Sequence, residues 1–379
     1  MRALTTMLQA GRLTVTVRHE ELPLEDCVTY ATRQNPRRLY LFVSKVLGKH
    51  WPVRPSVMRD VHARLAAKVA ALPGPLLVIG MAETATALGR GVAEEAALQT
   101  GRDDILYLQT TRYRLLRPQA FSFDECHSHA PDHAVYLPDA KLQPLFRSAR
   151  TLVLVDDEIS TGRTLAELAR AYSRLNPGVE QMVLVCITNW LSDARRWELT
   201  ALLERPVLFP ALVEGEFQFE LDPTFPPPVL PSVVVSPSRG HDDIVTDPAR
   251  TGLVAGRWNM NPIALWERVR VRGIGEPLAV FGTGEYAYTP FRWALALEEE
   301  GHDVWFQSTT RSPILVGDAI ASRREFPDHC GDGIPNYLYN HDPARLPVIV
   351  YEHPAMLTHC LAGEIGGFAF TVEELCRAS

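Results

Sequence analysis

The sequence predicts an α/β protein built on parallel β-sheets, and three observations carry this prediction. Short apolar runs alternate with stretches of helical periodicity over residues 76–189. A proline-rich segment then interrupts this pattern, and the alternation restarts after it. Strands that alternate with helices are typical of βαβ units, whose strands lie parallel in one sheet. We therefore expect two α/β domains, residues 1–221 and 251–379, joined by a Pro-rich linker at residues 222–250.

The predicted elements follow one another in a regular order. An alternating apolar pattern predicts a first strand at residues 12–18. Short apolar runs then predict buried strands at residues 76–80, 105–109, 151–157 and 181–188. Apolar residues spaced three and four apart predict helices between them at residues 84–98 and 163–175. After the linker, strands are predicted at residues 277–282 and 303–310, on either side of a helix at residues 292–300.

The composition argues against several classes of protein. The net charge of −7 does not suit a nucleic-acid binder that works by bulk electrostatics. The longest apolar runs have the length of strands, well short of the roughly 20 residues that a membrane span needs. The N-terminus has no signal-peptide core, and the six cysteines form no CxxC pair, which is typical of reduced thiols. We expect a cytoplasmic protein that binds small molecules, with no nucleic-acid or membrane partner.

The segment LVLVDDEISTGRT, residues 152–164, places two acids and a turn of small residues between a strand and a helix. This loop lies at the carboxyl edge of the predicted sheet, where open α/β sheets bind ligands. Backbone N–H groups before a helix, together with the helix dipole, suit a phosphate group. The carboxylates of Asp156 and Asp157 suit vicinal hydroxyls, which donate charge-assisted hydrogen bonds. A phosphate beside a diol describes a ribose 5-phosphate, and the chain contains no GxxxxGK[ST] motif that would indicate a Walker A loop instead.

The same segment resembles the phosphoribosyl-pyrophosphate (PRPP) signature of type I phosphoribosyltransferases of the orotate-phosphoribosyltransferase-like kind. The resemblance implies the parallel-sheet PRPP-binding fold of this family, and an enzyme that uses PRPP and Mg²⁺ to transfer ribose 5-phosphate to or from a base-like acceptor. Glu158 departs from the usual apolar residue. Ser160 departs from the aspartate of enzymes that act on hypoxanthine or guanine, so a 6-oxopurine acceptor is not expected. Surface acids on a plain strand-turn-helix are the alternative. The resemblance assigns PRPP binding, with Mg²⁺ held through PRPP and the two aspartates, to Asp156, Asp157, Ile159, Ser160, Thr161, Gly162, Arg163 and Thr164.

A second loop of small residues follows the strand predicted at residues 76–80. By resemblance it is the loop that binds the leaving pyrophosphate through backbone N–H groups, and in this family it often contains a non-proline cis peptide. A plain βα turn is the alternative. The loop comprises Gly80, Met81, Ala82, Glu83 and Thr84.

Residues 110–133 are rich in His and acids, and by resemblance they form a lid over the reacting sugar. Negative charge grows on pyrophosphate as it departs, so positioned cations would stabilise it, and closure would exclude water. A basic segment at residues 35–53 could form part of a hood over the base, or a solvated basic helix face. Zinc held by Cys126, His127, His129 and His133, or plain solvated histidines, are alternatives for the lid. The catalytic candidates are Arg112, Arg114, His127, His129 and Lys45.

The second domain repeats the plan of the first. Gly282 and Glu285 correspond to Gly80 and Glu83, and Thr309-Thr310-Arg311 corresponds to Thr110-Thr111-Arg112. Tyr351-Glu352 stands in place of the two aspartates, but no TGxT turn follows. We infer that the second domain is a diverged copy of the first that lost the ribose-phosphate loop. Chance similarity is one alternative, and a dinucleotide-binding GxGxxA turn that begins at Gly282 is another.

The string STTRSPI, residues 308–314, also resembles the signature of the TRSP domain, which follows a PRPP-fold domain in proteins of bacterial tellurium-resistance and stress gene clusters. These clusters are thought to make a nucleoside-like metabolite, so the resemblance implies a biosynthetic transferase, with other proteins of such a cluster as candidate partners. A homodimer is the family default. A non-catalytic PRPP-binding regulator and an interaction scaffold are alternatives. The polar candidates of this domain, for an anion or for domain contact, are Gly282, Gly284, Glu285, Thr309, Thr310, Arg311, Ser312, Asp332 and Asn340.

Overall fold

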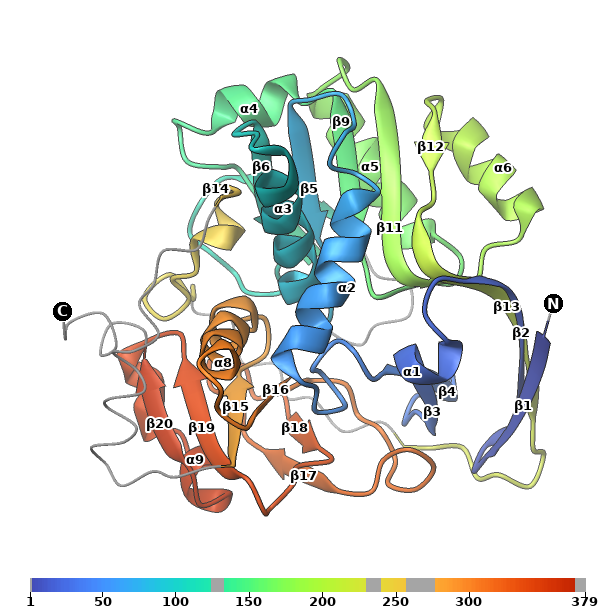
Figure 1. Cartoon of the computed structure of the whole chain (residues 1–379), viewed down its shortest axis with the longest axis vertical. Coiled ribbons are helices and arrows are strands. Elements are labelled where there is room, and N and C mark those ends of the chain that lie inside the picture. The colour runs from blue at the N-terminus through green and yellow to red at the C-terminus, as the bar shows by residue number, and fades with distance from the viewer. Residues whose placement is uncertain (1, 124–132, 230–239, 257–276, 372–379) are drawn as a thin grey trace.

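The computed structural model describes residues 2–123, 133–229, 240–256 and 277–371. Its elements gather around two sheets, a large one in the upper half of Figure 1 and a small one at the lower left. Both sheets carry helices, so the α/β class predicted from the sequence is confirmed.

The large sheet has the strand order β1-β2-β13-β11-β9-β5-β6-β14. Its four central strands, β11, β9, β5 and β6, are parallel. All residues of β5, β6 and β9 are buried, as expected for strands whose sheet is covered on both faces. The strands of the main path are β1 (Arg2–Leu8), β2 (Gly11–Glu20), β5 (Leu76–Gly80), β6 (Ile105–Gln109), β9 (Thr151–Val155), β11 (Gln181–Asn189), β13 (Ala211–Leu221) and β14 (Leu253–Val254).

Two helices set where a ligand can bind this sheet. Helix α3 (Thr86–Thr100) joins β5 to β6, and helix α5 (Arg163–Leu175) joins β9 to β11. The two crossovers run in opposite directions from the middle of the sheet, and right-handed crossovers therefore place the helices on opposite faces. Figure 1 shows α3 in front of the sheet and α5 behind it. The order reverses between β5 and β9, and open α/β sheets bind ligands beyond the carboxyl ends of the strands at such a point.

Smaller elements surround this core. Two antiparallel hairpins flank the sheet, one formed by β3 (Val28–Thr32) and β4 (Tyr40–Ser44), the other by β7 (Gln119–Phe123) and β8 (His133–Tyr136). Two short strands, β10 (Glu158–Ile159) and β12 (Val207–Leu208), pair with β11. The remaining helices of this half are α1 (Leu24–Cys27), α2 (Pro55–Ala67), α4 (Gln143–Ser148) and α6 (Asp193–Leu203).

The small sheet has the order β16-β15-β19-β20, and all its neighbours are parallel. This order matches that of β6-β5-β9-β11 in the large sheet, and helix α8 (Tyr288–Glu299) joins β15 to β16 as α3 joins β5 to β6. The strands are β15 (Leu278–Gly282), β16 (Val304–Ser308), β19 (Leu346–Tyr351) and β20 (Phe368–Thr371). The other elements are the hairpin of β17 (Arg323–Phe326) and β18 (Asn336–Tyr339), helix α9 (Leu361–Glu364), and the 3₁₀ helices η1 (Pro248–Arg250) and η2 (Pro354–Thr358).

The two halves share an apolar core where helices α2, α3 and α8 lie side by side (Figure 1). One buried cluster joins Val53, Met58 and Ala87 of the first half to the residues of α8 and β15. The ring of His62 on α2 lies 5.1 Å from that of Phe291 on α8. Each half also supplies a backbone pairing to an edge strand of the other half. Strand β14 pairs antiparallel with β6, and Val53 pairs with Phe306 of β16.

Most predicted elements are confirmed. The predicted strands at residues 76–80 and 105–109 are β5 and β6, and the helix predicted at residues 163–175 is α5. Strand β13 ends at Leu221, where the linker is predicted to begin. At the far end of the predicted linker, η1 and β14 pack on the first half of the chain. The domain boundaries themselves stay a prediction.

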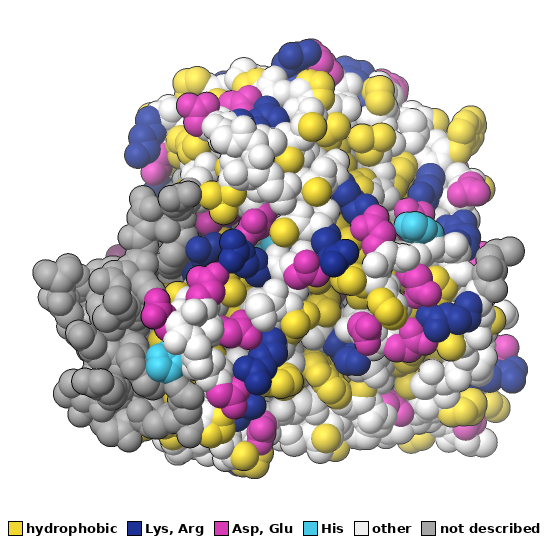
Figure 2. Space-filling model, viewed as in Figure 1, with side chains coloured by type: hydrophobic (Ala, Val, Ile, Leu, Met, Phe, Trp, Pro, Cys, Tyr) yellow, Lys and Arg dark blue, Asp and Glu magenta, His cyan; other side chains and the backbone are white. Residues whose placement is uncertain are grey.

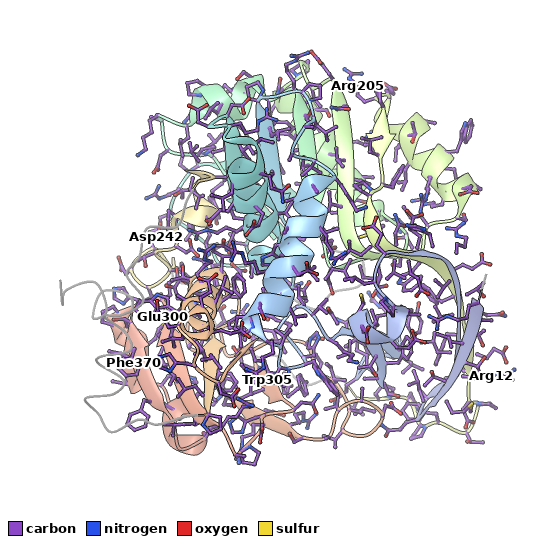
Figure 3. All side chains as sticks on the ribbon, in the orientation of Figure 1. Arg12, Arg205, Asp242, Glu300, Trp305 and Phe370 are labelled. Atoms are coloured by element: carbon purple, nitrogen blue, oxygen red, sulfur yellow. The ribbon has the colours of Figure 1, made fainter. Side chains whose placement is uncertain are left out.

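The face of the molecule seen in Figure 2 carries both signs of charge among its described residues. Figure 2 shows Lys and Arg mixed with Asp and Glu over the visible face. Figure 3 shows Arg12 and Arg205 at the outer parts of the first half, and Trp305 and Phe370 in the second. None of the helices within the described ranges is both long and apolar enough to cross a bilayer.

Candidate active site

A cavity of about 230 Å³ opens beyond the carboxyl ends of β5 and β9. The loop after β5 and the acids after β9 form one side of it. The hairpin β3–β4 contributes Arg33, Gln34, Asn35, Arg38 and Leu41. A third side comes from the second half of the chain, with Thr310, Arg311, Ser312, Pro313, Ile334 and Tyr337 among its residues. The cavity therefore lies at the point where the strand order reverses, between the two halves.

The loop from Gly80 to Thr84 is held at its start by groups at or just after the ends of the two neighbouring strands, β9 and β6. The Met81 N–H donates to Val155 O of β9 (3.0 Å), and the Ala82 N–H donates to Thr110 Oγ1 (2.8 Å). The Ala82–Glu83 peptide is cis, as the resemblance led us to expect. Met81, Ala82, Glu83 and Thr84 all line the cavity.

The two aspartates follow β9 directly and also line the cavity. Asp157 Oδ1 accepts a hydrogen bond from Thr84 Oγ1 (2.8 Å), so the two predicted ligand loops are in contact. The turn that follows leads into α5 through Gly162, whose φ of 66° is the left-handed conformation that glycine adopts readily. Thr164 in the first turn of α5 lines the cavity as well. Within the described residues, the backbone N–H groups of Ser160, Thr161 and Gly162 donate to no partner.

Glu83 carries a negative charge inside this wall. Its Oε1 lies 2.9 Å from Lys49 Nζ, and its Oε2 accepts from the backbone N–H of Arg311 (3.4 Å). Burial alone raises the pKa of Glu83, but the nearby Lys49, Arg311 and Arg112 outweigh it and lower the pKa to about 2. Glu83 is therefore ionised at neutral pH, and it ties the loop to both halves of the chain.

A second buried ion pair lies on the hairpin side of the cavity. Arg38 Nη2 donates to Glu158 Oε1 (2.7 Å) and Oε2 (3.0 Å). Burial raises the pKa of Glu158, the nearby Asp157 raises it further, and Arg38 opposes both. Glu158 and Arg38 thus form a fixed ion pair in the lining of the cavity.

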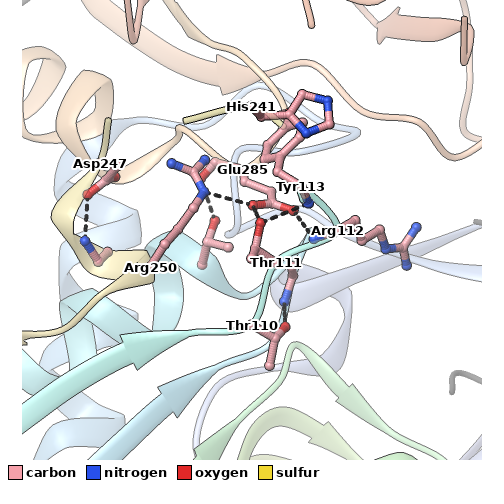
Figure 4. A network of polar contacts seen from close by, with 12 residues as sticks. Thr110, Thr111, Arg112, Tyr113, His241, Asp247, Arg250 and Glu285 are labelled. Carbon is pink, nitrogen blue, oxygen red and sulfur yellow. Dashed lines mark hydrogen bonds and ion pairs between the residues drawn. The ribbon is translucent and has the colours of Figure 1, made fainter. Parts of the chain in front are cut away.

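The segment Thr110–Arg112 links this cavity to the second half (Figure 4). Arg112 Nε donates to His133 Nε2 (3.1 Å), and His133 Nδ1 lies 3.1 Å from Thr110 Oγ1. The Arg112 N–H donates to Glu285 Oε1 (2.8 Å), and Thr111 Oγ1 donates to Glu285 Oε2 (2.6 Å). Since both ring nitrogens of His133 are engaged by protein groups, this histidine is not placed to bind zinc.

The corresponding region of the second half repeats these contacts. The Gly284 N–H donates to Thr309 Oγ1 (3.0 Å), as the Ala82 N–H does to Thr110 Oγ1 (2.8 Å). Tyr339 Oη accepts from the Ile314 N–H (2.8 Å), as Tyr136 Oη accepts from the Leu115 N–H (2.7 Å). These pairs extend the internal repeat that the sequence predicts.

The similarity between the two halves ends after β19, where the second half lacks the groups proposed to bind ribose 5-phosphate in the first. The registers of β15 and β19 place Glu352 where Asp157 stands in the first half. Arg250 fills the space in front of it: Nη1 and Nη2 donate to Glu352 (2.6 and 3.2 Å), and Nε donates to Glu285 Oε2 (3.2 Å). Arg250 is 1% exposed. A 3₁₀ helix, η2, replaces the glycine turn and the long helix α5.

Not all predicted site residues come together. Met81 to Thr84, the two aspartates, Thr164 and Arg112 line one cavity, whereas Gly80 and the predicted residues Ile159 to Arg163 are not among its lining residues. Arg114 is exposed and lies outside it, and Lys45 Nζ donates to Glu25 O (2.8 Å) away from it. His127 and His129, with Cys126, lie outside the described residues.

The candidates of the second half divide in the same way. Thr310, Arg311 and Ser312 line the cavity, whereas Asp332 binds Arg311 (2.9 Å) from behind. Asn340 Nδ2 donates to His50 O (3.2 Å) and lies elsewhere. Sequence reasoning did not assign Glu158 to an ion pair, although its departure from the family pattern was a signal.

Two sequence profiles match the chain. Residues 27–216 match that of a phosphoribosyl transferase family, and residues 263–359 match that of the TRSP domain found C-terminal to this family. No curated protein matches the chain.

Solved structures to which the chain is similar include adenine phosphoribosyltransferases. That of Giardia lamblia with 9-deazaadenine is 17% identical, with 42% of this chain and 80% of that chain covered and a TM-score of 0.30. That of Trypanosoma brucei with AMP, pyrophosphate and ribose-5-phosphate is 12% identical, with 51% and 81% covered and a TM-score of 0.37.

Proposed function

The chain belongs to this phosphoribosyl transferase family, an enzyme family of the glycosyltransferase class, and from that premise we propose that it transfers ribose 5-phosphate between PRPP and a base-like acceptor. One observation carries the proposal. The two loops with the PRPP-related patterns, Gly80–Thr84 and Asp156–Thr164, meet at one cavity and are joined by the bond from Thr84 to Asp157 (2.8 Å).

Each part of the cavity has a role in this proposal. The turn Ser160–Thr164 binds the 5-phosphate through its backbone N–H groups, and Asp156 and Asp157 accept from the ribose hydroxyls. The Gly80–Thr84 loop and Arg112 bind the pyrophosphate. Burial strengthens these charge interactions, because little water competes with them.

In the forward direction, the bond from the anomeric carbon to the pyrophosphate oxygen breaks, and pyrophosphate leaves with the electron pair. A lone pair of the acceptor forms the new bond to the same carbon, and the proton that the acceptor loses passes to the departing pyrophosphate or to water. Charge grows on the pyrophosphate, so Arg112 and the N–H groups of Glu83 and Thr84 favour the transition state over the bound substrate. The hairpin β3–β4 covers the sugar and excludes water from it.

The donor groups also fit Mg²⁺. Carboxylate oxygens are suitable ligands for this ion, which usually retains waters and binds through one or two carboxylates plus substrate phosphates. Asp156 and Asp157 supply the carboxylates, whereas the described residues offer no group of three His, Cys, Asp or Glu that could hold a metal alone. When bound, Mg²⁺ would neutralise charge on the pyrophosphate.

We further place this reaction in the cytoplasm, in the biosynthesis of a nucleoside-like metabolite linked to tellurium resistance or stress. This placement rests on the reduced cysteines and on the TRSP resemblance. Its test is metabolite profiling of a deletion strain, in which the product of the reaction should be missing.

Isothermal titration with PRPP and Mg²⁺ tests the proposed function. We expect binding by the native protein and its loss in the double variant Asp156→Asn with Asp157→Asn, because two carboxylates that accept from the ribose are removed together. The exposed Asp193→Asn is the matched control and should bind normally. Absence of native binding, or unchanged binding by the double variant, would contradict the proposal. Pyrophosphate release with a cognate base then separates an enzyme from a PRPP-binding regulator.

A further inference from the structure

The TRSP segment, Thr310–Pro313, lies on the wall of the cavity beside the Gly80–Thr84 loop, although some two hundred residues separate the two in the chain. The backbone N–H of Arg311 donates to Glu83 Oε2 of that loop (3.4 Å). The TRSP segment therefore contacts the part of the site where the proposed function places pyrophosphate.

The conformation of this segment is fixed by its own contacts. Thr310 Oγ1 accepts from the Ser312 N–H (3.1 Å), and Ser312 O accepts from Tyr339 Oη (2.8 Å). Asp332 holds the guanidinium of Arg311 through Nη2 (2.9 Å), and Asp332 is held in turn by His241 (2.8 Å). The guanidinium also lies 5.0 Å from the centre of the Tyr113 ring. Arg311 is thus oriented before any ligand binds.

Two donors of this segment remain unused. Nη1 of Arg311 is buried and has no hydrogen-bond partner among the residues that the structure describes. Ser312 Oγ donates to none of these residues either. A buried guanidinium nitrogen without a partner is costly, unless a ligand supplies the acceptor.

The internal repeat gives a second, independent argument. Arg311 corresponds to Arg112, and both line the same cavity, one from each half of the chain. Two arginines therefore flank Glu83, and with Lys49 they place three cations beside its carboxylate, of which Asp332 pairs with Arg311.

We propose that the second domain completes the substrate site of the first, with Arg311 and Ser312 donating to the pyrophosphate of PRPP. This rests on the proposed function and extends it: a domain that has lost its own ligand loop contributes a binding wall to its neighbour. Arg311 and Arg112 bind the pyrophosphate from opposite sides.

Titration with two probes, Mg²⁺-pyrophosphate and ribose 5-phosphate, tests this inference. Arg311→Met should weaken pyrophosphate binding by about 10- to 100-fold, the size of one charge-assisted hydrogen bond, and leave ribose 5-phosphate binding unchanged. Arg311→Lys should recover part of the affinity because it keeps the charge. Ser312→Ala should weaken pyrophosphate binding by about 2- to 10-fold, and it remains informative if Arg311→Met does not fold. The exposed Arg324→Met of the same domain is the matched control.

The outcomes separate this inference from the proposed function. If the native protein binds neither probe, the proposed function fails. If it binds both, and Arg311→Met and Ser312→Ala bind pyrophosphate like the native protein, only the inference is overturned. The variant Asp332→Asn identifies a purely structural role of Arg311. In that case Arg311→Met and Asp332→Asn would lower the melting temperature by the same amount, and neither would change the affinity for pyrophosphate.

Discussion

Asp157 and Glu352 occupy equivalent positions after β9 and β19, yet their surroundings differ completely. Asp157 borders a cavity and accepts from Thr84, whereas Glu352 is buried against Arg250. The strand order, the loop contacts and the tyrosine that holds the following segment are the same on both sides. The comparison teaches that the carboxyl ends of the strands can bind a ligand or hold the protein together. Which of the two they do depends on whether a ligand or a buried arginine lies against the acid.

The largest difference is expected when each acid is replaced by its amide. Glu352→Gln should lower the free energy of unfolding by about 3–5 kcal/mol, because it leaves the buried Arg250 without its main partner. Asp157→Asn should change stability by about 1 kcal/mol or less, and should instead weaken PRPP binding. Chemical denaturation and titration of both variants measure this. A stable Glu352→Gln protein would show that the second site does not serve cohesion.

A smaller effect is expected at the glycines that end β5 and β15. A Cβ on Gly80 would lie 2.7 Å from Ala85 O, and one on Gly282 would lie 2.6 Å from Tyr286 O. Each alanine substitution should therefore cost about 1–3 kcal/mol of stability. Only Gly80→Ala should also weaken PRPP binding, measured by titration at a temperature where both variants are folded. Gly363→Ala, where a Cβ meets nothing within 4 Å, is the control, and equal effects on binding at Gly80 and Gly282 would contradict the comparison.

Much of this comparison could be predicted from the sequence. The ends of α5 agree with the prediction because Gly162 and the apolar spacing are local signals. The repeat could be predicted because Gly282, Glu285 and Thr309–Arg311 keep their residue types. Lys45 and Lys49 illustrate the limit: one bonds to Glu25 O and the other is buried against Glu83, although both belong to the same basic segment. Which of them reaches the loop depends on how this segment crosses to the second half, and no local pattern encodes such a long-range contact.

The last effect, which is absent at neutral pH, concerns the apolar core that both halves share. Burial, and to a lesser degree Arg292, lowers the pKa of His62 to about 3. The folded pKa lies below the unfolded value of about 6.5, so the unfolded chain takes up a proton first as the pH falls. Its contribution to stability is therefore present above pH 6.5, and is lost towards pH 3 by at most about 1.4 kcal/mol per pH unit.

The test is the slope of unfolding free energy against pH. His62→Gln should give a shallower slope than the native protein between pH 6.5 and 4.5, measured by urea denaturation. Equal slopes would mean that the junction of the two halves does not sense pH through this residue.

The strand pairings between the two halves limit where the chain can be cut into fragments that fold. Residues 253–254 close the open side of β6, and Val53 does the same for β16, so each half carries a piece that the other requires. A fragment cut at the end of β13 would leave β6 with bare backbone donors and acceptors, a surface prone to aggregate. Separately expressed halves should therefore be insoluble alone and recover when produced together, which makes the presence of both halves, rather than the peptide link between them, a condition of folding.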